Sequence, residues 1–208
     1  MYKTVIFDFD GTIADTFSIF CNTLRKLSED FGQKELTEED IKAYRAKGAK
    51  ALIKDFKILP WRIPFLIKKG QVLFQEKIQE AEPFPQIPEI LYKLAESNNK
   101  LGVLTTNSRK NVQIFLKKHN LEVFAFIVSV PSLFSKSRTI RSTFKKYNLK
   151  CKEVIYVGDE LRDIENAKKA GVDVVAVTWG YNNKELLVRG NPDFIIEKPK
   201  ELLNILQD

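Results

Sequence analysis

Short apolar runs alternate with helical patterns along most of the chain. Continuous runs that suit strands buried on both faces occupy residues 4–7, 101–104, 125–128, 154–157, 172–177 and 194–196. Between several of them, apolar residues recur at helical spacing, as at Val112, Phe115 and Leu116. Strands that alternate with helices form a parallel sheet covered on both faces. The predicted fold class is therefore α/β, with a doubly wound, Rossmann-like parallel sheet.

Residues 16–81 break this rhythm because they contain no convincing strand. Helical patterns fill the stretch, over residues 16–31, 37–44, 49–56 and 64–81. Thr37 and Asp40 have the spacing of an N-cap pair, and Pro64 suits a first helical turn. Prolines at 83, 85 and 88 mark the return to the sheet. We therefore predict a core domain of residues 1–14 and 83–208, and an inserted helical cap domain of residues 15–82.

The composition fits a globular protein: the 208 residues are 44% hydrophobic and 29% charged. The net charge is +7, and residues 42–69 hold nine basic residues against one acid, Asp55. This imbalance favours an anionic partner, although a solvated helical face explains it as well. Cys21 and Cys151 are far apart in sequence, which predicts a reducing, cytoplasmic location. The most apolar window, residues 58–67, is too short to span a membrane, so we predict no membrane partner.

Two acids directly follow the first predicted strand. Asp8 and Asp10 are two residues apart in an extended segment, so both can face one ligand at the carboxyl end of the sheet. Gly11 then allows a sharp turn. Neighbouring carboxylates repel each other unless a cation lies between them, and oxygen ligands favour Mg²⁺ over zinc. The pattern predicts a Mg²⁺ site, and the alternative is a polar strand end followed by a solvated turn.

A second acidic pair, Asp159 and Asp163, follows the predicted strand at residues 154–157. These carboxylates can complete an oxygen cage for the same cation. The alternative is that Asp159 is a helix N-cap and Asp163 is solvated. Residues 105–108 and Lys136 also follow strands and precede helices, which suits phosphate binding, although residues 105–108 are also ordinary N-cap types.

Taken in order, the four segments resemble the motifs of the haloacid dehalogenase-like hydrolase superfamily. The matching residues are Asp8-x-Asp10-Gly11-Thr12, Thr106, Lys136 and Gly158-Asp159-x3-Asp163. The helical insert resembles the cap of the phosphoglycolate phosphatase and β-phosphoglucomutase branch. The resemblance implies a Mg²⁺-dependent phosphatase that hydrolyses a small phosphorylated metabolite, a phosphoglycolate-like phosphomonoester, through an aspartyl-phosphate intermediate.

The resemblance also implies a role for each acid. Asp8 would be the nucleophile and a metal ligand. Asp10 would be the general acid and then the general base, and its backbone carbonyl would ligate the metal. Asp159 would be a metal ligand through its side chain. Asp163 would hold the metal's waters and orient Lys136.

Substrate binding is implied for four other residues. Thr106, Lys136 and the backbone around Asn107 would bind the phosphoryl oxygens. The cap would recognise the leaving group, and Arg45, at the end of a predicted helix, is the candidate for a second anionic group of the substrate. A surface charge is the alternative for Arg45.

Two other functions stay open. One is a phosphomutase of the β-phosphoglucomutase kind, although Thr12 favours a phosphatase because mutases of this branch commonly have Val there. The other is a non-catalytic basic scaffold that binds nucleic acid. The intact set of acids counts against the scaffold, so nucleic acid is not the expected partner, whereas monomer and homodimer both stay open.

Overall fold

A computed structural model describes residues 2–48, 58–130 and 136–207. It contains a six-stranded parallel sheet with the order β5-β4-β1-β6-β7-β8. The strands are β1 (Thr4–Phe7), β4 (Lys100–Thr105), β5 (Phe126–Ser129), β6 (Val154–Gly158), β7 (Asp173–Val177) and β8 (Phe194–Ile196). Each coincides with a predicted apolar run. The predicted α/β class, a parallel sheet with a helical insert, is confirmed.

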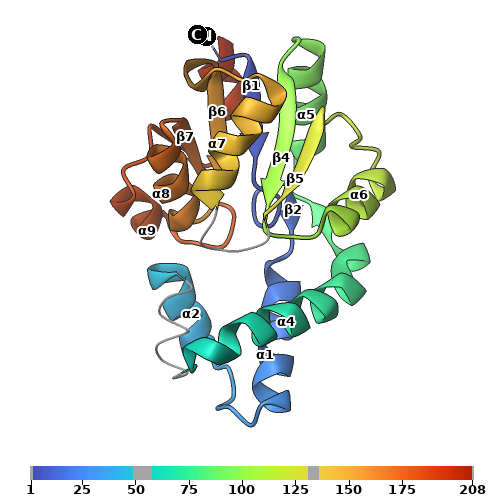
Figure 1. The fold of residues 1–208 in the computed structure, drawn as a ribbon, viewed down its shortest axis with the longest axis vertical. Helices are drawn as coiled ribbons and strands as arrows, with labels where there is room; N and C mark the ends of the chain where they lie inside the picture. The colour runs from blue at the N-terminus through green and yellow to red at the C-terminus, as the bar shows by residue number, and fades with distance from the viewer. Residues whose placement is uncertain (1, 49–57, 131–135, 208) are drawn as a thin grey trace.

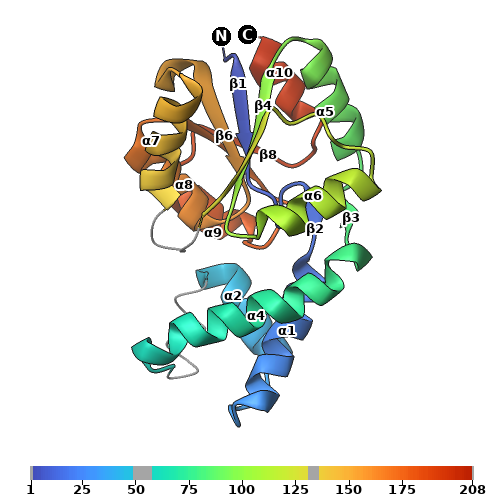
Figure 2. The ribbon, with the colours of Figure 1, turned by 45° about the vertical axis from the view of Figure 1, so that its right-hand side comes forward.

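Helices cover both faces of this sheet (Figure 2). One face carries α5 (Ile87–Glu96), α6 (Arg109–Lys118) and α10 (Glu201–Gln207), and the other carries α7 (Lys136–Tyr147) and α8 (Leu161–Ala170). A short helix, α9 (Lys184–Arg189), follows β7.

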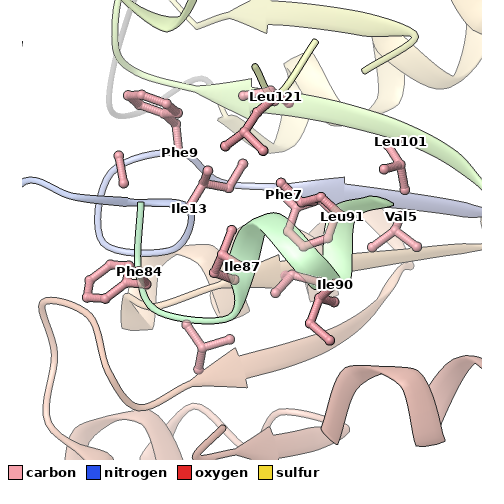
Figure 3. Packing of buried hydrophobic residues seen from close by; sticks show 14 of the residues in the cluster. Val5, Phe7, Phe9, Ile13, Phe84, Ile87, Ile90, Leu91, Leu101 and Leu121 are labelled. Atoms are coloured by element: carbon pink, nitrogen blue, oxygen red, sulfur yellow. The ribbon is translucent and has the colours of Figure 1, made fainter. Parts of the chain in front are cut away.

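The alternation of side chains along β1 builds a separate core on each face. Val5 and Phe7 belong to the cluster that contains Leu91 of α5, which Figure 3 shows from close by. Ile6 points the other way and belongs to the cluster that contains Ile164 of α8. Each fully buried side chain of this size stabilises the fold by about 1.5–3 kcal/mol. Burial on both faces explains why the strands are continuous apolar runs.

The chain leaves the sheet after β1 and returns before α5. The two crossings, β2 (Ala14–Asp15) and β3 (Glu82–Pro83), pair as antiparallel strands. The predicted domain boundaries, after residues 14 and 82, fall within this pair. The helical cap between them contains α1 (Phe17–Asp30), α2 (Glu38–Lys47), α4 (Ile63–Lys77) and the 3-10 turns Pro60–Arg62 and Ile78–Glu80. Figure 1 shows α1, α2 and α4 beyond the edge of the sheet at which β1 ends. The predicted helix at residues 49–56 lies outside the described residues.

The start of α2 is held by the predicted pair of capping residues. Thr37 Oγ1 accepts a hydrogen bond from the Asp40 N–H at 3.2 Å, and Asp40 Oδ2 accepts one from the Thr37 N–H at 3.0 Å. We expect Thr37→Ala to lower the free energy of unfolding by about 1 kcal/mol, because the Asp40 N–H at the start of α2 loses its hydrogen-bond acceptor. Urea denaturation measures this, and Thr37→Ser, which keeps the hydroxyl, is the control. Equal stabilities of the two variants would contradict the prediction.

Candidate active site

The predicted site residues converge at one edge of the sheet. Asp8 directly follows β1, and Asp159 directly follows β6. Because β1 pairs with both β4 and β6, the segments after all three strands lie side by side. Asp8 and Asp159 are buried, with 4% and 0% of their surface exposed. The cap lies beyond this same edge (Figure 1).

Three carboxylates form a compact cluster here. Asp8, Asp159 and Asp163 each contribute one oxygen, and these oxygens lie within 4.8 Å of one another. Lys136 Nζ donates to Asp8 Oδ2 at 2.9 Å and to Asp163 Oδ1 at 2.5 Å. Three ionised carboxylates and one ammonium leave a net charge of −2 in a buried space. Such a charge is costly without a counter-ion, so the residues fit a divalent cation with oxygen ligands.

The pKa values of the clustered carboxylates also reflect the cost of burying negative charges close together. Burial raises the pKa of Asp8 to about 7, and the attraction of Lys136 only partly offsets it. Burial, together with repulsion from Glu160, Asp163 and Asp8, raises the pKa of Asp159 well above its ordinary value. Burial lowers the pKa of Lys136, but Asp163 and Asp8 outweigh this effect and hold it well above its ordinary value. The carboxylates therefore lack compensating positive charge, which a bound cation would supply.

Asp159 is fixed by tertiary contacts and does not cap a helix. Its Oδ1 accepts a hydrogen bond from Thr12 Oγ1 at 2.8 Å, and its Oδ2 accepts one from the Tyr181 N–H at 2.7 Å. The N-cap of α8 is Glu160, whose N–H donates to Asp163 Oδ2 at 3.1 Å. The alternative of Asp159 as N-cap and a solvated Asp163 is therefore wrong, because both carboxylates are turned inward and fully buried.

Two glycines allow the backbone to approach Asp159 closely. Gly11 has φ +77°, which confirms the predicted sharp turn, and a Cβ there would lie 2.1 Å from Asp159 Oδ2. A Cβ at Gly180 would lie 2.3 Å from the same oxygen and 2.3 Å from the Gly11 carbonyl oxygen. No side chain fits at either position without displacing this carboxylate.

Gly180→Ala is therefore expected to weaken metal binding. The added methyl group must push Asp159 or the Gly11 backbone aside, and loss of ligand support typically weakens metal affinity about 10- to 100-fold. Isothermal titration of the purified protein with Mg²⁺ measures the change. Gly70→Ala is a suitable control, because its Cβ would meet only the flexible side chains of Leu27 and Thr23. Unchanged affinity in Gly180→Ala would argue against a metal at Asp159.

The carboxylate of Asp10 has different partners. Its Oδ1 accepts a hydrogen bond from Thr16 Oγ1 at 3.0 Å, and Asn107 Nδ2 donates to both of its oxygens at 3.1 Å. Burial raises the pKa of Asp10 to about 6, and these hydrogen bonds limit the rise. Among the described residues, the side-chain cluster that fits a metal does not include Asp10. The predicted metal contact through its backbone carbonyl stays a prediction.

Of the predicted phosphate-binding residues, Asn107 lies beside Asp10, whereas Lys136 contacts Asp8. Thr106 directly follows β4 and is partly buried. The backbone N–H of Asn107 already donates to Thr105 Oγ1 at 3.0 Å. The side-chain amide of Asn107 orients the Asp10 carboxylate. Ser108 is the N-cap of α6, with its side chain accepting from the Asn111 N–H. Phosphate contacts of Thr106 and Asn107 therefore stay predictions.

Arg45 lies at the junction of cap and core. Its Nη2 donates to the Gly180 carbonyl at 3.1 Å, and its guanidinium carbon lies 4.7 Å from the centre of the Phe17 ring. Its own carbonyl accepts a hydrogen bond from the Asn183 N–H at 2.9 Å. These contacts join α2 to the loop after β7. The predicted contact between Arg45 and the substrate stays a prediction.

Sequence reasoning missed several residues around the acids. Tyr44 donates to Glu160 Oε2 at 3.2 Å, and Glu160 pairs with Arg162. Arg162 also lowers the pKa values of Asp8 and Asp10, although less than burial raises them. Glu160 and Arg162 lie between Asp159 and Asp163 in the last matching segment, and this position in the sequence was the available signal that they lie near the site. Tyr44 has no such signal, because its partner is more than a hundred residues away.

Comparison with known proteins places this site in a family. The chain matches the family model of haloacid dehalogenase-like hydrolases over residues 5–177. A phosphoglycolate phosphatase from Synechococcus elongatus is 31% identical over 202 residues, which cover 97% of this chain and 95% of the relative. Pyrophosphatase PpaX from Bacillus thuringiensis is 25% identical over 211 residues, with coverage of 99% and 97%. The crystal structure of a predicted phosphatase from Clostridium acetobutylicum shares the fold, with a TM-score of 0.88, 21% identity and full coverage of both chains.

The chain therefore belongs to the haloacid dehalogenase-like hydrolases, and it is a phosphatase of that family. Within the family, it is similar to the phosphoglycolate phosphatase and PpaX branch with a helical cap. Because the chain is an enzyme, the alternative of a non-catalytic scaffold is wrong. In the part of the chain that the structure describes, none of the helices is long and apolar enough to cross a membrane.

Proposed function

We propose that this protein is a Mg²⁺-dependent phosphatase acting on a small phosphomonoester with a second anionic group, of the phosphoglycolate kind. The observation that carries the proposal is the buried cluster of Asp8, Asp159 and Asp163 with Lys136 between two of its members. Buried carboxylates with raised pKa values are typical of catalytic sites rather than of stable cores. The name of the relative from Synechococcus elongatus supports the substrate class.

The side chains would hold the metal and the phosphoryl group together. Asp8, Asp159 and the Asp10 carbonyl would hold Mg²⁺, which, when bound, neutralises charge between the carboxylate nucleophile and the phosphate. Lys136 would hold a phosphoryl oxygen while it keeps Asp8 in place, since its Nζ already lies 2.9 Å from Asp8 Oδ2. Thr106 would bind a second phosphoryl oxygen.

The reaction would proceed in two steps, formation of the aspartyl-phosphate and its hydrolysis. In the first, a carboxylate oxygen of Asp8 bonds to phosphorus, the bond from phosphorus to the leaving oxygen breaks, and Asp10 gives that oxygen its proton. In the second, Asp10 takes a proton from water, and the water oxygen attacks the phosphorus of the aspartyl-phosphate. The bond between phosphorus and the Asp8 oxygen breaks, inorganic phosphate leaves with the oxygen from water, and Asp8 and Asp10 return to their starting forms.

The leaving group would be recognised where the cap meets the core. Arg45 lies at this junction, close to the loop that carries Gly180. A guanidinium can bind a carboxylate with two parallel hydrogen bonds, and one bond to a carbonyl leaves it further donors. We therefore retain Arg45 as the proposed contact for the substrate's second anion.

Phosphate release with and without metal tests this proposal. We expect wild-type protein with Mg²⁺ to hydrolyse 2-phosphoglycolate, and EDTA to reduce release to background. 2-Hydroxyethyl phosphate, which lacks the carboxylate, is the matched substrate. Its kcat/KM should be about 10- to 100-fold lower, because hydrogen bonds to a charged group contribute about 1.5–3 kcal/mol.

Two outcomes would contradict separate parts of the proposal. Full activity in EDTA, after dialysis against the chelator, would exclude a required metal. Equal kcat/KM for the two substrates would leave the phosphatase in place and remove the second anionic group from the substrate class.

A further inference from the structure

Tyr181 connects the cap helices to the catalytic carboxylates, yet the steps above give it no part. Its side chain is 3% exposed. The ring centroid lies 5.1 Å from that of Phe17 and 5.1 Å from that of Phe20, both on α1. Its backbone N–H donates to Asp159 Oδ2 at 2.7 Å. The residue is therefore fixed by the cap on one side and by the predicted metal ligand on the other.

The hydroxyl of Tyr181 reaches Asp10 through a single intermediate residue. Thr16 Oγ1 lies 2.9 Å from the Tyr181 hydroxyl oxygen and 3.0 Å from Asp10 Oδ1, and Thr16 is fully buried. Each hydroxyl has one proton, and an ionised carboxylate can only accept. Thr16 therefore donates to Asp10, which leaves Tyr181 as the donor to Thr16.

This chain of hydrogen bonds makes the two oxygens of Asp10 unequal. Oδ1 receives donors from both Thr16 and Asn107, whereas Oδ2 receives one from Asn107 alone. Because the two acceptor positions of Oδ1 are filled, the proton of the acid form belongs on Oδ2. Hydrogen bonds in a chain strengthen one another, so the donor at the far end contributes to this preference.

We propose that Tyr181 is a positioning residue for general acid catalysis, which holds the Thr16 proton on Asp10 Oδ1 and so leaves Oδ2 to protonate the leaving oxygen. This inference deepens the proposed function and rests on it. The aromatic contacts with α1 explain why a tyrosine suits the position: the ring fixes the hydroxyl, and only the hydroxyl acts on Asp10.

Tyr181→Phe tests the proposal because it removes the hydroxyl and keeps the ring. The readout is kcat/KM for two substrates whose leaving groups differ in their need for a proton. With 2-phosphoglycolate, whose leaving alkoxide must be protonated, we expect kcat/KM to fall about 10-fold, which is the scale of one lost hydrogen bond. With 4-nitrophenyl phosphate, whose leaving group is stable as an anion, we expect little loss. The affinity for Mg²⁺ should be unchanged, because the backbone N–H to Asp159 remains.

Further variants at Tyr44 and Thr16 separate positioning from packing. Tyr44→Phe also removes a buried hydroxyl from the same aromatic group, but that hydroxyl donates to Glu160, so the ratio between the substrates should not change. Thr16→Val should reproduce the selective loss with 2-phosphoglycolate, whereas Thr16→Ser, which keeps the hydroxyl, should retain the activity. Adding Tyr181→Phe to Thr16→Val should cause no further loss.

The outcomes also separate this inference from the proposed function. If Tyr181→Phe lowers kcat/KM equally for both substrates, or alters KM alone, Tyr181 acts only through packing and the inference is overturned. Wild-type activity in Tyr181→Phe overturns it as well. Absence of phosphate release by the wild-type protein would instead contradict the proposed function itself.

Discussion

Asp8→Asn is expected to abolish phosphate release, with a loss in kcat of at least about 10³-fold. An amide cannot form the aspartyl-phosphate, so neither step of the proposed reaction can proceed. The position of Asp8 supports this role, since it is buried at the end of β1 and its Oδ2 is held by Lys136 at 2.9 Å. Rapid quenching followed by mass spectrometry should detect one added phosphoryl group on the wild-type protein and none on Asp8→Asn.

A matched ion pair on the surface provides the control for Asp8→Asn. Asp30 Oδ2 lies 2.7 Å from Lys69 Nζ, with both side chains partly exposed and far from the site in sequence. Asp30→Asn makes the same chemical change to a carboxylate–lysine pair, and we expect it to keep wild-type kcat, because exposed pairs contribute little. If Asp8→Asn stays within about 10-fold of the wild-type kcat, Asp8 is not the nucleophile.

Much of the architecture could be predicted because burial on both faces leaves a clear mark on the sequence. β1 and β6 are uninterrupted apolar runs, and their carboxyl ends are marked by the first polar residues that follow, Asp8 and Asp159. Because β1 and β6 pair in parallel, their carboxyl ends lie side by side, and this does not depend on how the helices pack. The positions of these two acids, which are proposed metal ligands, therefore follow from the strand ends alone.

The partners of these acids could not be predicted, because they depend on contacts between distant segments. Thr12 donates to Asp159 across 147 positions, and Tyr181 reaches Thr16 across 165. The start of α8 depends on the same contacts: the Asp159 carboxylate is drawn into them, so Glu160, rather than Asp159 as in the alternative interpretation, is the N-cap. Helix patterns locate such a start only within a residue or two.

Asp10→Asn should separate the two chemical steps, because the proposed reaction uses Asp10 as the acid in the first step and as the base in the second. We expect kcat/KM for 2-phosphoglycolate to fall about 10²- to 10⁴-fold, the usual contribution of a general acid. 4-Nitrophenyl phosphate needs no acid, so its first step should survive. Its second step lacks a base, and the variant should release about one 4-nitrophenolate per active site and then stall as the aspartyl-phosphate.

The pH dependence of the wild-type protein provides an independent check on Asp10. Burial raises the pKa of Asp10 to about 6, so its protonated fraction falls with each step in pH above that value. Because kcat/KM reports groups of the free enzyme, kcat/KM for 2-phosphoglycolate should decline above about pH 6. The decline should vanish in Asp10→Asn and be weak for 4-nitrophenyl phosphate. A decline of equal size with both substrates would assign it to another group, and the absence of a burst in Asp10→Asn would remove Asp10 from the second step.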